Sequence, residues 1–351
     1  MEQPPDVFHY VRVTRPEELP PADDRIVDVS ILDMNHSWPN LGHDSLVRIV
    51  RGVGCDLHEA MCEAGLTLRV LSFDVRGGTV LPAKPSERFS LFLGTGGPGH
   101  LDPRENNGVA EWSQGVVDRD HWERPLFALF DAVMADEQAV LLAVCHTYGL
   151  LCRWSGAAVP KLRGPEKGGK SSGVLENVLS DEALAHPWFS RFAEAIPDGR
   201  RLRILDSRLF DLIPTGSLPA GATALGYETN GAPGKPGEAV TMIEFARDRA
   251  GVMPRVLGVN HHPEILQRDS LLKLLEQKFR RGDVTAEWYD ERVKILTTQH
   301  AGEDSERLVM LTSHYTLVAP LRFHLTRIFR RRAEALGRAL GLHEDATLTA
   351  R

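Results

Sequence analysis

The sequence predicts an α/β fold: a mostly parallel, open β-sheet with helices on both faces, extended by helices at the carboxy terminus. Between residues 25 and 144, short runs of β-branched and apolar residues alternate with segments of helical periodicity. One of these runs, AVLLAV at residues 139–144, is apolar throughout, as is typical of a strand buried on both faces. After Leu266 the strand pattern stops and three helical patterns follow.

The first half of the sheet is predicted in the order strand, helix, strand, strand, helix, strand. β-rich runs predict the strands, and apolar residues at helical spacing predict the helices. In chain order these elements cover residues 25–34 (strand), 44–64 (helix), 66–75 and 88–94 (strands), 126–134 (helix) and 139–144 (strand).

The second half begins with a predicted surface loop at residues 161–173, which is rich in Gly, Lys, Pro and Ser. Shorter strands are predicted at residues 201–208, 222–229, 239–246 and 255–260, and helices at 271–279, 287–296 and 317–340. Five prolines in residues 1–24 predict an irregular arm or an edge element. We therefore expect an amino-terminal arm (1–24), an α/β domain (25–268) and a helical extension (269–351).

The composition is that of a folded protein. The chain has 351 residues, of which 42% are apolar and 25% charged, and its formal net charge is −7. This charge gives no general attraction to nucleic acids or anionic membranes, and no apolar run reaches the roughly 18 residues of a membrane span. The amino terminus lacks a basic leader and an apolar core, and the four cysteines are too few for a disulfide framework, so we expect a cytoplasmic protein.

Two glycine-rich segments resemble nucleotide-binding motifs. GTGGPG at residues 94–99 follows a predicted strand, but the prolines and glycines after it prevent the helix that a dinucleotide site requires. A loop that exposes backbone N–H groups, or simply a tight turn, fits better. GPEKGGKS at residues 164–171 matches the phosphate-loop pattern, but neither a buried strand before it nor a helix after it is evident. A mobile surface loop is the favoured interpretation, and an ATP site the alternative.

Cys145 lies where the buried strand at 139–144 runs directly into an apolar helical segment. A thiol at such a turn projects from the edge of the sheet, and the amino terminus of a helix favours the thiolate that nucleophilic attack requires. The alternative is a buried cysteine that packs like alanine, which is the interpretation we adopt for Cys55, Cys62 and Cys152.

The end of the last predicted strand, GVNHHPE, supplies the groups that would activate such a thiol. His262 can accept the thiol proton, and Glu264 can orient and polarise the imidazole, giving a Cys-His-Glu triad for acyl transfer. A structural histidine is the alternative interpretation. A metal site is not expected, because the other histidines show no ligand spacing, and no cofactor is predicted.

Taken in order, GGPG, VCHTYGLL and GVNHHPE resemble the class I glutamine amidotransferase family over residues 25–268. The resemblance implies a flavodoxin-like α/β sheet, with Cys145 as nucleophile, His262 as base and Glu264 as its orienting acid. It also implies an oxyanion hole formed by the backbone amides of Gly97 and His146. It further implies a small-molecule amide as substrate and a separate synthetase as a partner for any ammonia released.

The sequence departs from that family around the substrate. Thr147 replaces an elbow glycine, Gly149 replaces the glutamine that helps to hold the substrate, and Ser207 and Arg208 stand where the family has Ser-His. We expect these four residues and Gly96 to contact the substrate, and the changes leave open whether free glutamine is cleaved. The rival hypothesis is a non-catalytic binding relative that uses the basic helix around Arg330. The carboxy-terminal helices could also pair two copies of the chain.

Overall fold

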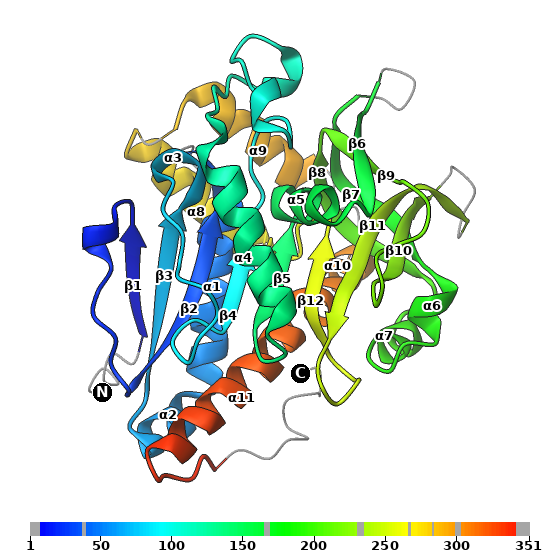
Figure 1. Cartoon of the computed structure of the whole chain (residues 1–351). Coiled ribbons are helices and arrows are strands. Elements are labelled where there is room, and N and C mark those ends of the chain that lie inside the picture. Colours follow the sequence, from blue (N-terminus) through cyan, green and yellow to red (C-terminus); the bar gives the residue numbers. More distant parts are fainter. Residues whose placement is uncertain are drawn as a thin grey trace.

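The computed structural model describes residues 8–36, 40–164, 169–229, 235–265, 268–282, 284–298 and 303–341. Within them, a ten-stranded sheet has the order β1-β3-β2-β4-β5-β12-β11-β10-β7-β8 (Figure 1). Its strands are β1 (Phe8–Val13), β2 (Ile26–Asp33), β3 (Thr67–Asp74), β4 (Leu91–Gly94), β5 (Val140–Val144), β7 (Ser171–Leu179), β8 (Arg201–Arg208), β10 (Thr223–Thr229), β11 (Pro236–Arg247) and β12 (Pro254–Val259).

The sheet is parallel from β1 to β12 and antiparallel from β12 to β8. Five of its nine strand pairings in the described residues are therefore parallel and four antiparallel. The central order β3-β2-β4-β5-β12 is the 2-1-3-4-5 order of flavodoxin-like doubly wound sheets. The predicted fold class is thus confirmed.

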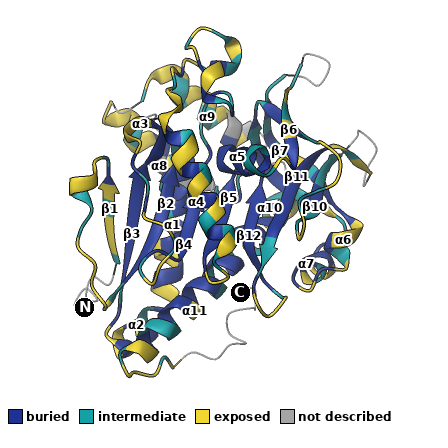
Figure 2. Ribbon diagram, viewed as in Figure 1, coloured by how far each residue is buried: buried dark blue, intermediate teal, exposed yellow. Residues whose placement is uncertain are grey.

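Successive side chains of a strand point to opposite faces of the sheet, so the buried strands present apolar side chains on both faces. Helices cover both of these faces. In β5, Val140, Leu142 and Val144 join the core on one side, whereas Leu141 and Ala143 join the core on the other. The first core includes side chains of α1 (Leu41–Asp56), α2 (His58–Ala64), α7 (Phe189–Ala195) and α11 (Ala319–Ala335), and the second includes those of α4 (Glu123–Ala135) and α5 (His146–Ser155). Figure 2 shows the central strands buried and the outward sides of several of these helices exposed.

The carboxy-terminal part is helical, as predicted. It also contains a helix at residues 303–313 that the sequence did not indicate. The whole part comprises α8 (Arg268–Arg280), α9 (Ala286–Thr298), α10 (Glu303–Ser313), the π-helical turn η6 (His314–Val318) and α11. α11 lies against the sheet and buries Leu321, Leu325 and Phe329 in the same core as β2 and β5. By contrast, α8 and α9 pack through a small separate cluster around Leu41, Leu275 and Leu296.

In the amino-terminal arm, β1 forms an edge strand beside β3, which is one of the two alternatives predicted for this segment. Two other predicted boundaries need correction. The predicted loop at 161–173 is strand at both ends, because β6 (Ala158–Leu162) pairs with the distant β9 (Phe210–Pro214) and β7 begins at Ser171. The predicted helix at 44–64 is interrupted at Leu57.

The remaining short helices are η1 (Pro16–Glu18), α3 (Val75–Gly78), η2 (Pro103–Glu105), η3 (Glu111–Ser113), η4 (Asp120–Trp122) and α6 (Asp181–Leu184). None of the helices that the structure describes combines the length and the apolar character needed to cross a membrane.

Candidate active site

Cys145 occupies a strained turn between β5 and α5. Its backbone angles are φ 47° and ψ −100°, in a region that non-glycine residues rarely adopt. Such a conformation costs on the order of 1–3 kcal/mol and persists only where the surrounding structure imposes it. Here β5 is held between β4 and β12, and the Cys145 amide donates to the Val259 carbonyl at 2.8 Å. The turn places the thiol at the amino terminus of α5.

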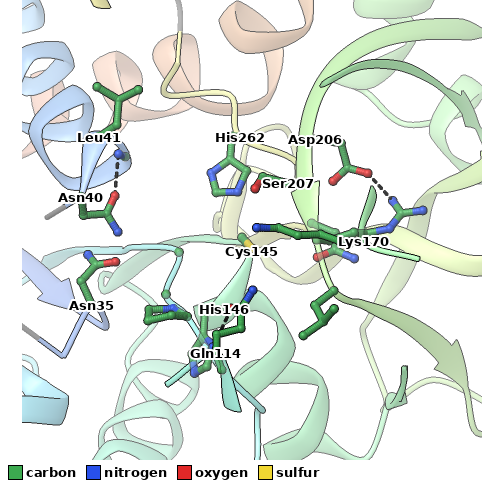
Figure 3. Close-up of a pocket in the computed structure, with 18 of the residues that line it drawn as sticks. Asn35, Asn40, Leu41, Gln114, Cys145, His146, Lys170, Asp206, Ser207 and His262 are labelled. Carbon is green, nitrogen blue, oxygen red and sulfur yellow. Dashed lines mark hydrogen bonds and ion pairs between the residues drawn. The ribbon is translucent and has the colours of Figure 1, made fainter. Parts of the chain in front are cut away.

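His262 reaches Cys145 because β12 lies beside β5 in parallel. Val259 pairs with Val144, so the residues that follow these two strands leave the same edge of the sheet. The His262 amide donates to the Leu205 carbonyl at 2.8 Å, and its ring lies beside Cys145 (Figure 3). The thiol is close enough to the imidazole for the two groups to interact electrostatically. The structure thus brings together two side chains that are 117 positions apart in the sequence.

Glu264 holds the other side of the imidazole. Its Oε1 lies 2.8 Å from His262 Nδ1, and the carboxylate is buried. Burial lowers the pKa of His262, but the charges of Glu264 and Cys145 and the hydrogen bonds to both outweigh it and raise that pKa well above its usual range. The arrangement therefore favours the imidazolium form of His262 beside the Cys145 sulfur.

The amino terminus of α1 packs against the Glu264 carboxylate. A Cβ atom on Gly42 would lie only 2.7 Å from Glu264 Oε1, so glycine is needed there for the helix to come this close. The Asn40 side chain caps the same helix by accepting hydrogen bonds from the amides of Gly42 and His43 at 2.6 and 3.2 Å. The helix end thus fixes the position of the carboxylate.

The GTGGPG segment forms a loop after β4 and opens no helix. A Cβ atom on Gly97 would lie 2.3 Å from the Met34 carbonyl oxygen, and one on Gly96 would lie 3.0 Å from His262 Cε1. The buried Arg76 holds the loop by donating to the carbonyls of Met34 and Pro98 at 3.0 and 2.7 Å. Gly96 and Gly97 consequently line the same pocket as Cys145.

His146, directly after Cys145, lies at the start of α5, and its ring is buried. Burial, and secondarily the charges of Arg76 and Arg153, lower the pKa of His146 well below its usual range, so its ring is neutral. Its Nε2 atom has no hydrogen-bond partner within the described residues.

The pocket has a volume of about 300 Å³ and contains most of the residues predicted from the sequence. Of these, it is lined by Gly96, Gly97, Cys145, His146, Gly149, Ser207, Arg208 and His262.

Two of the residues predicted to contact the substrate, Thr147 and Arg208, are instead bonded to other groups of the protein. Thr147 does not line the pocket: its hydroxyl donates to the Thr95 carbonyl at 2.7 Å, deep in the core. Arg208 lines the pocket but is engaged by three carboxylates, with Asp206, Asp211 and Glu228 at 3.2, 3.1 and 2.8 Å. Gly149 lines the pocket, and a Cβ atom there would lie 2.5 Å from Leu101 Cδ1, so Leu101 fills the space beside it.

The pocket also contains residues that the sequence did not identify. Asn35 and Asn260 each have a buried polar side-chain atom without a partner in the described residues. Helix α9 contributes a whole wall, made of Trp288, Glu291, Arg292 and Leu296. The sequence predicted a helix here, but no spacing or composition signal indicated that it would line the pocket. Its place over the pocket depends on how the carboxy-terminal helices pack.

Lys170, from the phosphate-loop match, also lies in this pocket. The hypothesis of a nucleotide site at 164–171 is not supported, because the strand β7 begins at Ser171, where the motif requires a helix. Residues 165–168 of that segment lie outside the described residues. A search for three or more clustered His, Cys, Asp or Glu side chains suited to a metal finds none in the described part of the chain.

No protein-family model matches the sequence, and no curated protein does. Among solved structures, the chain is similar to SMU.1228c, with 15% identity, a TM-score of 0.46, and 86% of this chain and 99% of that one covered. It is also similar to a putative GMP synthase component from Thermoplasma acidophilum (12% identity, TM-score 0.39, 68% and 85% covered). A third similar structure is the glutaminase domain of Trypanosoma brucei CTPS with bound acivicin (9% identity, TM-score 0.40, 69% and 87% covered).

Proposed function

We propose that this protein is an enzyme that cleaves an amide through a thioester intermediate, in the manner of class I glutamine amidotransferases. In this proposal Cys145 is the nucleophile, His262 the general base and acid, and Glu264 the group that orients and charges His262. The observation that carries it is the strained Cys145 elbow, which faces an imidazole in the same pocket that a buried carboxylate holds at 2.8 Å.

In the first half of the reaction, the Cys145 thiolate attacks the carbonyl carbon of the amide. The backbone N–H groups of Gly97 and His146 stabilise the negative charge that develops on the carbonyl oxygen. His262, as imidazolium, donates its proton to the leaving nitrogen. The C–N bond breaks, ammonia or an amine departs, and the acyl group remains on the sulfur as a thioester.

In the second half, water attacks the thioester while neutral His262 accepts a proton from it. The C–S bond breaks, the carboxylic acid leaves, and the thiolate and imidazolium are restored. The ammonia is either released or passed to a separate synthetase. An assay of ammonia release by the purified chain distinguishes these outcomes, because release without any partner makes a synthetase unnecessary.

The rival hypothesis is a non-catalytic binding protein of the same fold. It requires an occluded or misdirected thiol, whereas Cys145 lines an open pocket together with His262. It also relies on the basic helix around Arg330, yet neighbouring arginines of α11 are bonded within the chain. Arg327 contacts Asp248 at 3.2 Å, and Arg332 donates to the Glu87 carbonyl at 2.9 Å. These contacts favour catalysis over partner binding.

The test is the substitution Cys145→Ala. The wild-type protein is exposed to a panel of primary amides, glutamine included, and assayed for ammonia and for an acyl adduct on Cys145 by mass spectrometry. We expect the variant to lose both signals, whereas Cys152→Ala, which removes a buried thiol of the same helix, retains them. Equal activity of the wild type and Cys145→Ala would remove Cys145 from the mechanism.

A further inference from the structure

Three lysine or arginine side chains from the described residues line the pocket, and two of them are already neutralised. Arg208 is surrounded by three carboxylates, and Arg292 is paired with Glu291 at 2.7 Å. Lys170 is different. It forms no ion pair with a carboxylate in the part of the chain that the structure describes, although its side chain is half-buried. As far as the described side chains extend, the pocket therefore holds one cation without a counter-ion.

Lys170 points at the reaction centre. Figure 3 shows its side chain reaching across the pocket toward Cys145, from the side of β7 and β8. His146, at the start of α5, lies below the sulfur in the same view, and Gly97, the other residue of the proposed oxyanion hole, lines the same pocket. An amide whose carbonyl oxygen occupies that hole would therefore place its acyl group in the same cavity as Lys170.

The surroundings of Lys170 are those of a site for an anion. Burial, and secondarily the positive charge of Arg292, lower the pKa of Lys170. The negative charges of Glu291 and Cys145 act in the opposite direction. Glu291 already pairs with Arg292, and the charge of Cys145 is shared with His262. A cation removed from water without a dedicated partner is unfavourable, and an anionic ligand that pairs with it offsets that penalty.

We propose that Lys170 binds a carboxylate carried by the acyl part of the amide substrate, so that the enzyme selects acidic amides over neutral ones. This inference rests on the proposed function and specifies its substrate class. Lys170 is here a specificity-determining residue. The competing role, in which its charge merely favours the Cys145 thiolate, would act on neutral and acidic reagents alike.

The test compares two thiol reagents that differ in charge. Iodoacetate and iodoacetamide alkylate the same sulfur, but only iodoacetate carries the carboxylate. Mass spectrometry measures the rate constant for each reagent at Cys145 and, in the same sample, at the exposed Cys55 and Cys62. The exposed thiols report the intrinsic preference between the reagents and the effect of the net charge of the protein.

We expect the ratio of iodoacetate to iodoacetamide rates to be at least about tenfold higher at Cys145 than at the exposed cysteines, the fold-change expected from one hydrogen bond to a charged group. Lys170→Met and Lys170→Gln should lower this ratio about tenfold with little change in the iodoacetamide rate, and the excess that remains is due to the His262 imidazolium beside the sulfur. Lys161→Met, which removes an exposed lysine of β6 outside the pocket, should leave the ratio intact.

Two results would overturn the inference: Lys170 variants that leave the ratio at Cys145 unchanged, or Lys170 variants that slow both reagents equally. The second result would assign Lys170 to thiolate activation instead. Failure of the proposed function looks different, because Cys145 would then react no faster than Cys55 and Cys62 with either reagent. The ratio of the iodoacetate rate to the iodoacetamide rate at Cys145 can still be measured in that case. The experiment therefore still tests whether Lys170 favours the negatively charged reagent.

Discussion

Replacement of Glu264 by Gln removes the charge that stabilises the His262 imidazolium while keeping an oxygen within reach of Nδ1. The carboxylate lies 2.8 Å from that nitrogen and is buried, so solvent screens the interaction little. The carboxylate contributes to the raised pKa of His262 through its charge and its hydrogen bond. A hydrogen bond to a charged group contributes about 1.5–3 kcal/mol, so we expect Glu264→Gln to lower the population of the proposed thiolate–imidazolium pair by about 10- to 100-fold near neutral pH.

The assay is the pH dependence of Cys145 alkylation by iodoacetamide, followed by mass spectrometry. In the wild type, alkylation should remain fast below neutral pH, and in Glu264→Gln the fast phase should be lost and the profile should move toward that of an ordinary thiol. Glu59→Gln, an exposed residue of α2, is the control. Melting curves check that each variant is folded. Superimposable profiles for the wild type and Glu264→Gln would refute the assignment of Glu264 as the group that charges His262.

Two further predictions concern packing and acid stability. Gly42→Ala should displace Glu264 and so slow Cys145 alkylation by about 10–100-fold. Gly52→Ala is the control, because an added Cβ atom there meets open space in the same helix. It should only stabilise α1, by up to about 1 kcal/mol. An unaltered rate in Gly42→Ala would contradict the contact. Burial, as the largest cause, lowers the pKa of His261 to about 3 and of His324 to about 4, so each contributes stability above pH 6.5 that is lost as the pH falls. Urea unfolding at pH 7 and pH 5 should show a loss of about 2 kcal/mol per histidine, and His324→Gln should remove one such contribution. An equal pH dependence in wild type and variant would show that His324 is not held neutral.

The proposed site depends on an unfavourable backbone conformation at Cys145, and the sequence explains how this conformation is sustained. The strand before the elbow is apolar at every position from Val140 to Val144, and all of these residues are buried. The helix after it buries seven successive residues from His146 to Cys152. Packing on both sides therefore holds the turn in a conformation that a solvated loop would abandon.

The sequence by itself determined the central strands of the sheet and the residue types placed at their ends. Continuous apolar runs are required for strands buried on both faces, so β2, β3 and β5 could be recognised from composition. The Cys145 junction and the strand end with His262 and Glu264 could be recognised for the same reason, since each group immediately follows such a run. That Cys145 and His262 lie close together followed only from the expectation that parallel strands present their carboxyl ends at one edge of the sheet.

Only the tertiary structure decided which side chains surround the sulfur. The pairing of β6 with β9 and the edge position of β1 depend on hydrogen bonds between distant segments, which leave no local periodicity. In the same way, the closure of the pocket by α9 and the neutralisation of Arg208 depend on contacts between separate elements. Residue type alone could not distinguish the neutralised Arg208 from Lys170, because the difference lies in which carboxylates the fold brings near each cation.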